Sequence, residues 1–203
     1  MGLNVMGAGF LPKVRFPLAE HLCTLLEPSE EAAAVLVPGM SASDFILTLA
    51  RQGLVIDAIR YLAVGLPRRE AVWWACACRR RFLTDPLPAA EEAAWAAAEG
   101  WVYEPTEPRR RAAFAPAEAL KHQTAGAYAA LGVFWSGGSL APPEVSIVIP
   151  PADSLTGSAV AASVILCCVP GAAKTISARH EAAFQIGCDI ANGGSGQVES
   201  VAR

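Results

Sequence analysis

Apolar, alanine-rich segments alternate along this chain with prolines, glycines and small polar residues. Alanine is the best helix former, and prolines and serines stand where helices would begin, so each segment predicts a short helix. Such segments fill residues 17–135 and predict a helical array; examples are residues 54–64, 89–103 and 108–120. Residues 153–192 predict a C-terminal pair of helices.

The pattern breaks at residues 136–152, SGGSLAPPEVSIVIPPA, which contain four prolines and two glycines. No helix can pass through this composition, so we predict a Pro-rich crossover between the array and the C-terminal pair. Within it, residues 145–149 can be extended or form a short edge strand. The two ends have little to bury, and we expect residues 1–16 and 193–203 to be flexible.

Three helix starts share a proline, a charged triplet and an apolar run, beginning at Pro28, Pro67 and Pro108. Their spacing of about 40 residues is typical of HEAT-like helical arrays. The same helix-start chemistry can also recur by chance. We therefore predict an all-α fold of about ten short antiparallel helices, either HEAT-like or an irregular bundle.

Composition agrees with a folded helical domain. Hydrophobic residues make up 53% of the chain and charged residues 17%, which excludes a disordered protein. The net charge of −3 gives no general attraction to nucleic acid, and we interpret the arginine clusters as solvated helix ends. The most apolar run, residues 159–169, is shorter than the roughly 20 residues that cross a bilayer. With no clear signal-peptide layout either, we expect a cytoplasmic protein.

The most unusual stretch is LPRREAVWWACACRRR, residues 66–81. Residues 71–78 are apolar on every helical face, which is typical of a buried helix. In this interpretation Trp73 and Trp74 pack against helices on either side, Cys76 and Cys78 lie in the core, and Glu70 pairs with an arginine near its centre. The alternative is a partner-binding groove, whose anchors would be the following residues: Arg69, Trp74 and Trp135.

Candidate chemistry is sparse. Cys76 and Cys78 would point about 200° apart on a helix, so they cannot hold one metal ion together. The three histidines are isolated, and no nucleotide-binding or hydrolase motif is present. We expect no metal and no cofactor.

Several motifs along the chain resemble those of a known family. The run LPRREAVWWACACR, preceded by DAIRYLAVGLP and followed by RAAFAPAEAL and FWSGGSLAPP, is similar to an uncharacterised bacterial family of helical proteins, a domain of unknown function. The similarity covers roughly residues 20–195 and implies an all-helical fold. Some members lie in type VI secretion gene clusters, which implies an accessory or adaptor role. The family offers no established catalytic residues.

Taken together, these features predict a non-catalytic cytoplasmic module that binds another protein, with an accessory or adaptor role in a bacterial secretion system. An enzyme, or an enzyme subunit whose site forms only in three dimensions, is the alternative. A third is a membrane-surface accessory that uses the apolar N-terminus.

Overall fold

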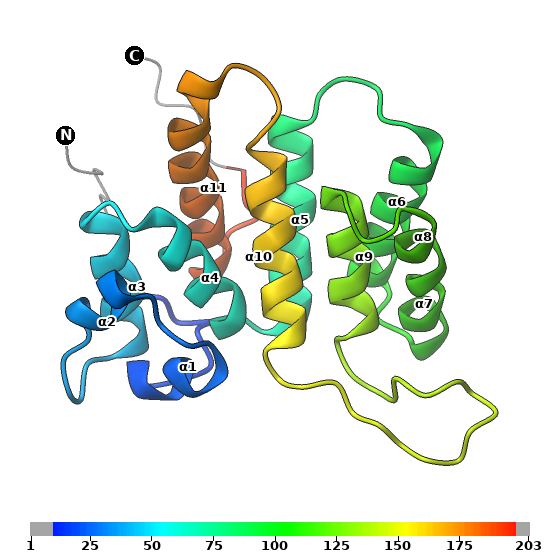
Figure 1. The fold of residues 1–203 in the computed structure, drawn as a ribbon, viewed down its shortest axis with the longest axis horizontal. Helices are drawn as coiled ribbons and strands as arrows, with labels where there is room; N and C mark the ends of the chain where they lie inside the picture. Colours follow the sequence, from blue (N-terminus) through cyan, green and yellow to red (C-terminus); the bar gives the residue numbers. More distant parts are fainter. Residues whose placement is uncertain (1–9, 198–203) are drawn as a thin grey trace.

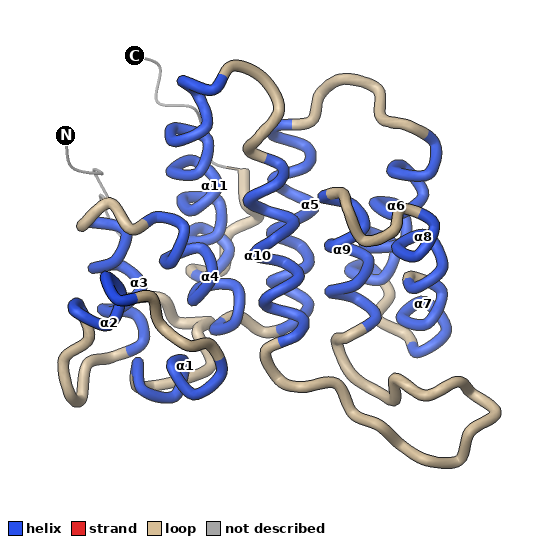
Figure 2. The backbone as a smooth tube through the Cα atoms, in the orientation of Figure 1, coloured by secondary structure: helices blue, strands red, loops and turns tan. Residues whose placement is uncertain are grey.

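The computed structural model of the chain describes residues 10–197, and these residues form only helices and loops (Figures 1 and 2). Within this range the one bridge of strand type is an isolated antiparallel pair, Leu18 with Ser41. The all-α prediction is confirmed. No helix in the same range is both long enough and apolar enough to cross a membrane.

The helices follow one another at short intervals. They are α1 (Ala19–Leu25), α2 (Glu30–Val35), α3 (Ala42–Arg51), α4 (Val55–Gly65), α5 (Arg68–Phe82), α6 (Ala89–Tyr103), α7 (Glu107–Ala112), α8 (Phe114–Ala119), α9 (Ala125–Phe134), α10 (Leu155–Cys167) and α11 (Ile176–Ala191), with a 3-10 turn at Ala173–Thr175.

Local capping chemistry explains several of the starts. The side chains of Ser29, Ser41 and Thr124 each accept a backbone N–H from the first turn of α2, α3 and α9. Pro67 immediately precedes α5, where a missing N–H removes no helical hydrogen bond.

Helix α10 occupies the centre of the molecule (Figure 1). It packs against α4 on one side and against α5 and α9 on the other, so it joins α1–α4 to α6–α9. In a solenoid each unit contacts only its sequence neighbours. The contact between α4 and α10 links distant parts of the chain, so the fold is an irregular bundle rather than a HEAT-like array. Both helices of the predicted C-terminal pair are present, but each packs more against α4 and α5 than against the other.

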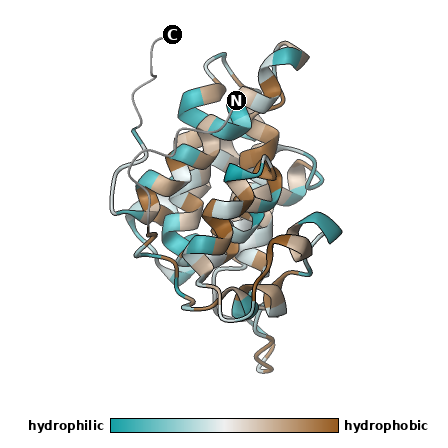
Figure 3. Cartoon of the chain, turned by 90° about the vertical axis from the view of Figure 1, so that its left-hand side faces the viewer, coloured by the Kyte–Doolittle hydropathy of each residue, from teal (hydrophilic) through white to brown (hydrophobic). Residues whose placement is uncertain are grey.

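The crossing of α4 and α10 depends on a glycine. A Cβ atom on Gly157 would lie 2.5 Å from Val64 Cα and 2.7 Å from Val64 N, so the two backbones touch. The helices of the N-terminal side are amphipathic: Figure 3 shows hydrophilic and hydrophobic residues on the same helices. The hydrophobic turns of α3, including Phe45, Ile46 and Leu49, are buried.

The segments next to the two ends are anchored. Leu11 is buried and its N–H donates to Ser43 Oγ at 3.2 Å, while Lys13 N–H donates to the carbonyl of Ala191 at 3.1 Å. At the other end, Ser195 O and Gly196 N–H hydrogen-bond to side chains of α5 and α11. The prediction of flexible ends is therefore wrong for residues 10–16 and 193–197. Residues 1–9 and 198–203 lie outside the described range.

Candidate interaction site

The two adjacent tryptophans of α5 have different surroundings. Trp74 is fully buried, and its indole N–H donates to the carbonyl of Ala183 in α11 at 2.8 Å. Its ring lies where a Cβ on Gly187 would sit, at 2.6 Å. The prediction of Trp74 as an exposed partner-binding anchor is therefore wrong, because the phase of α5 directs this indole toward α11.

Trp73 lies one residue earlier, about 100° around the helix, and is partly exposed. Its ring packs edge-on against Tyr103 with centroids 6.1 Å apart, and the Arg80 guanidinium lies 4.5 Å from its centroid. Its indole N–H donates to the carbonyl of Ser195 at 3.0 Å. The placement of Trp73 in the core is correct only in part, because the ring packs against the hydrophobic core but is partly exposed.

Hollows lie on both sides of Trp73, and we call them together the Trp73 groove. The first, of about 260 Å³, lies between α5, the end of α6, the end of α11 and the N-terminal segment. The second, of about 780 Å³, continues along α5 toward Arg80 and Arg81. Trp73 and Tyr103 line both hollows. The two hollows therefore share one aromatic wall, formed by these two side chains.

Arg69 and Glu70 both line the first hollow. Arg69 is exposed, and its Nε–H donates to the carbonyl of Val102 at 2.6 Å, which fixes the guanidinium at the C-terminal end of α6. Glu70 is only partly buried, and its carboxylate lies 3.5 Å from the ammonium of Lys13. The prediction of a central Glu70–arginine pair is wrong, because the anchored N-terminal segment brings a lysine to this carboxylate.

Trp135 is the C-cap of α9 and packs, partly buried, against the hydrophobic core. It lines neither hollow of the Trp73 groove. The fold therefore does not gather the three predicted anchors on one face: of these residues only Arg69 lies in the groove. Tyr103 was missed: antiparallel packing places the end of α6 beside the start of α5, but nothing in the sequence marks this tyrosine as exposed beside Trp73.

Cys76 and Cys78 are buried in the core, where they were predicted. Burial raises the pKa of Cys76 to about 12 and that of Cys78 well above its ordinary value. Both thiols therefore remain protonated at neutral pH, and a protonated thiol is a weak nucleophile. Within residues 10–197, no group of three or more His, Cys, Asp or Glu side chains is placed to hold a metal ion.

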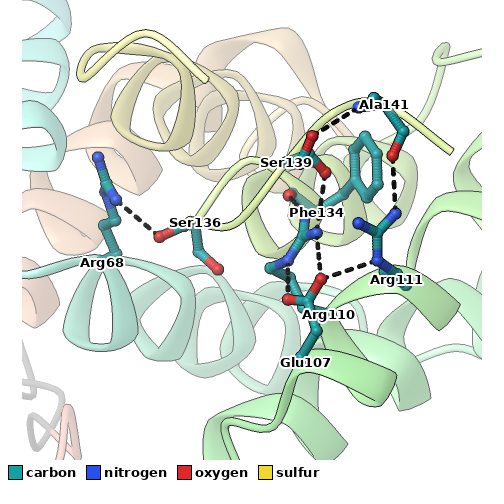
Figure 4. Close-up of polar contacts among 8 residues, drawn as sticks. All are labelled: Arg68, Glu107, Arg110, Arg111, Phe134, Ser136, Ser139 and Ala141. Atoms are coloured by element: carbon teal, nitrogen blue, oxygen red, sulfur yellow. Dashed lines mark hydrogen bonds and ion pairs between the residues drawn. The ribbon is translucent and has the colours of Figure 1, made fainter. Parts of the chain in front are cut away.

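A second polar assembly fixes the Pro-rich crossover (Figure 4). We call it the arginine clamp, formed by Arg68, Arg110 and Arg111. Arg110 is almost completely buried; it donates to the carbonyls of Phe134 and Ser139, and it pairs with Glu107 at 2.6 Å. The hydrogen bonds that Arg110 donates to the Glu107 carboxylate hold the pKa of Glu107 below its usual value.

The other two arginines of the clamp also donate to loop carbonyls. Arg111 donates to Ala141 O at 3.0 Å, and Arg68 to Ser136 O at 2.8 Å. The interpretation of these clusters as solvated helix ends is wrong for Arg110, because its guanidinium fills a buried position and satisfies loop carbonyls. No local signal in the sequence distinguishes it from its exposed neighbour Arg109.

No curated protein and no solved structure matches the chain. One family model matches residues 45–191, from within α3 to the last residue of α11. The match includes Arg69, Trp73 and Tyr103 of the Trp73 groove and the whole crossover loop, and it omits Lys13. Since this match covers most of the sequence, the chain belongs to the family described as "Family of unknown function (DUF6931)".

Proposed function

We propose that the chain is a protein–protein interaction module that binds a segment of a partner protein in the Trp73 groove. One observation carries the proposal: Trp73, Tyr103, Arg69 and Arg80 surround one groove, and Tyr103 is 66% exposed. Tryptophan, tyrosine and arginine are the residue types that dominate the binding energy of protein interfaces.

Hydrogen bonds between the groove region and the chain's own C-terminal segment support a peptide ligand. The Trp73 indole N–H binds the backbone carbonyl of Ser195, and the Asp189 carboxylate accepts the N–H of Gly196. Trp73 in the groove and Asp189 beside it thus bind both kinds of backbone group in a peptide segment without helical or strand structure. A donor and an acceptor of this kind suit a segment supplied by a partner.

The charges indicate what that segment carries. Lys13 pairs with Glu70, and Arg80 pairs with Glu99. Among the ion pairs of residues 10–197, none involves Arg69 or Arg81. The groove therefore has two cations that pair with no carboxylate of the described chain. These cations favour a partner segment with acidic side chains.

Photo-crosslinking tests the groove directly. A photoreactive phenylalanine analogue in place of Tyr103 should capture one partner protein in the native host. Trp73→Ala should abolish the capture and lower the thermal midpoint only modestly, because the ring is partly exposed. Val37→Ala, a matched control at a residue that is 59% exposed and lines neither hollow, should keep it. Undiminished capture by the Trp73→Ala variant would contradict the proposal.

A cytoplasmic role as an accessory or adaptor of a bacterial secretion system is also a proposal, and the family resemblance is its only support. The same capture tests it, since the partner would then be a component of such a machine. A partner from an unrelated process would leave the interaction module standing and remove the secretion role.

A further inference from the structure

The Pro-rich crossover exposes an unusual number of apolar side chains. It projects from the helical body as a long loop (Figure 1). Val145, Ile147, Val148 and Ile149 are 46%, 67%, 72% and 49% exposed. Large apolar side chains that are contiguous and exposed mark interaction sites in soluble proteins. This loop lines neither hollow of the Trp73 groove, so it needs an explanation of its own.

The base of the loop is fixed. The arginine clamp holds the carbonyls of Ser136, Ser139 and Ala141, as Figure 4 shows. Leu140 N–H donates to Ile149 O at 2.8 Å, and Ile149 N–H donates to Ser139 Oγ at 3.0 Å, which closes the loop at its neck. The clamp thus presents the exposed residues in a defined place.

The backbone beyond the neck is unpaired. Within the described chain, the N–H groups of Ser146, Ile147 and Val148 donate to no protein acceptor. The carbonyls of residues 144–148 likewise accept no hydrogen bond from residues 10–197. All of these residues are exposed. Donors and acceptors are therefore free for another chain.

The side chains of this segment are those of a strand. Valine and isoleucine, which are β-branched, favour strands. Prolines at 142, 143, 150 and 151 cannot donate to a ladder, so they limit any strand to residues 144–149. Six residues is an ordinary strand length. The described residues of this chain provide no sheet for it to join.

We propose that residues 144–149 add as a strand to the exposed sheet edge of a partner protein. The backbone bends at Ile147 in the free chain, and pairing would straighten it. In a straight strand the side chains of Val145, Ile147 and Ile149 share one face. That face would cover apolar side chains beside the partner's edge strand, while the backbone groups of Ser146 to Val148 complete the ladder.

Two other occupants fit less well. Pairing with a second copy would give a two-stranded ribbon, which is marginal in water without a larger sheet. Insertion into a bilayer is disfavoured by charge: residues 136–152 contain no lysine or arginine, and Glu144 begins the exposed segment. Membrane-binding segments normally carry cations that attract anionic lipid.

A photoreactive residue at Val148, in the full chain and in the native host, tests the proposal. It should capture one partner protein. Ile147→Pro removes an N–H that has no acceptor in the free protein, so folding should be unaffected while capture falls at least about tenfold. Ile147→Leu keeps the N–H and the apolar side chain and should retain capture. In the purified complex with that partner, amide exchange at residues 146–148 should slow at least about a hundredfold.

The remaining outcomes overturn the inference. Capture that is insensitive to Ile147→Pro, or amides that still exchange rapidly in the complex, would mean binding through side chains alone. A cross-link to a second copy would mean self-association, and flotation with vesicles of phosphatidylglycerol and phosphatidylethanolamine would mean membrane binding. No capture at all would also contradict the strand mechanism. Trp73→Ala separates the two proposals, because it should abolish capture from Tyr103 and leave capture from Val148 intact.

Discussion

Trp73 and Trp74 show how a single helical step assigns different roles to identical side chains. Trp74 has its only polar atom satisfied inside the core, by the carbonyl of Ala183. Trp73 offers the same N–H at the surface, to the carbonyl of Ser195. The first arrangement stabilises the bundle, and the second belongs to the proposed binding groove.

Substitution of each tryptophan by alanine should separate these roles. Trp74→Ala removes a fully buried ring and leaves the Ala183 carbonyl without its donor, so the free energy of unfolding should fall by about 3–5 kcal/mol. Trp73→Ala should cause a clearly smaller loss, because its ring is partly exposed. Urea unfolding followed by circular dichroism measures both. Equal losses would show that the two indoles are equally structural.

Which of the two indoles is buried could not be predicted from the sequence. Residues 71–78 are apolar on every side, so no polar stripe gives the phase of α5. The burial of Cys76 and Cys78 was predictable for the same reason, since any phase buries most of such a helix. The lysine that pairs with Glu70 and the loop carbonyls that bind Arg110 were not predictable, because they come from distant segments of the chain.

At the scale of elements, boundaries were more predictable than packing. The predicted helix over residues 89–103 coincides with α6, because prolines and charged residues in the sequence mark its ends. The predicted helix over residues 108–120 is split into α7 and α8 at Ala113. Pro116 explains the break: it has no N–H to donate to the carbonyl of Ala112, so a new helix begins with Pro116 in its first turn.

The contact between α4 and α10 should be intolerant of even one methyl group. Gly157→Ala would place a Cβ within 2.5 Å of Val64 Cα, and a backbone atom cannot move aside as a side chain can. We expect a loss of about 3 kcal/mol of stability. Gly137→Ala is the matched control, because a Cβ there meets nothing within 4 Å, and its effect should stay within about 0.5 kcal/mol. Thermal unfolding of both variants measures the difference, and similar midpoints would refute the close crossing.

At the scale of the whole molecule, the arginine clamp should make the stability of the fold depend on pH in the acid range. The pKa of Glu107 is lowered in the folded chain, chiefly by hydrogen bonds from Arg110. Its stabilising effect is therefore fully present above the ordinary glutamate pKa and is lost as the pH falls through the lowered value. Because the carboxylate is largely solvated, the effect should be modest.

Thermal midpoints measured across the acid range test this effect. Glu107→Gln should flatten the decline of the midpoint with falling pH, relative to the unaltered chain. Glu118→Gln changes another exposed carboxylate, one that forms no ion pair within residues 10–197, and should leave the decline as it was. An identical pH profile for both variants would show that Glu107 does not cause the acid dependence.

The central position of α10 has a consequence for how the chain folds during synthesis. Translation releases α4 and α5 well before α10 and α11, yet both early helices are covered mainly by these late ones. Until Ala183 leaves the ribosome, the Trp74 indole has no acceptor, and until Ala191 does, the N-terminal segment cannot close onto α11. The nascent chain therefore exposes apolar faces of α4 and α5 until these late helices are made, which favours transient association with chaperones.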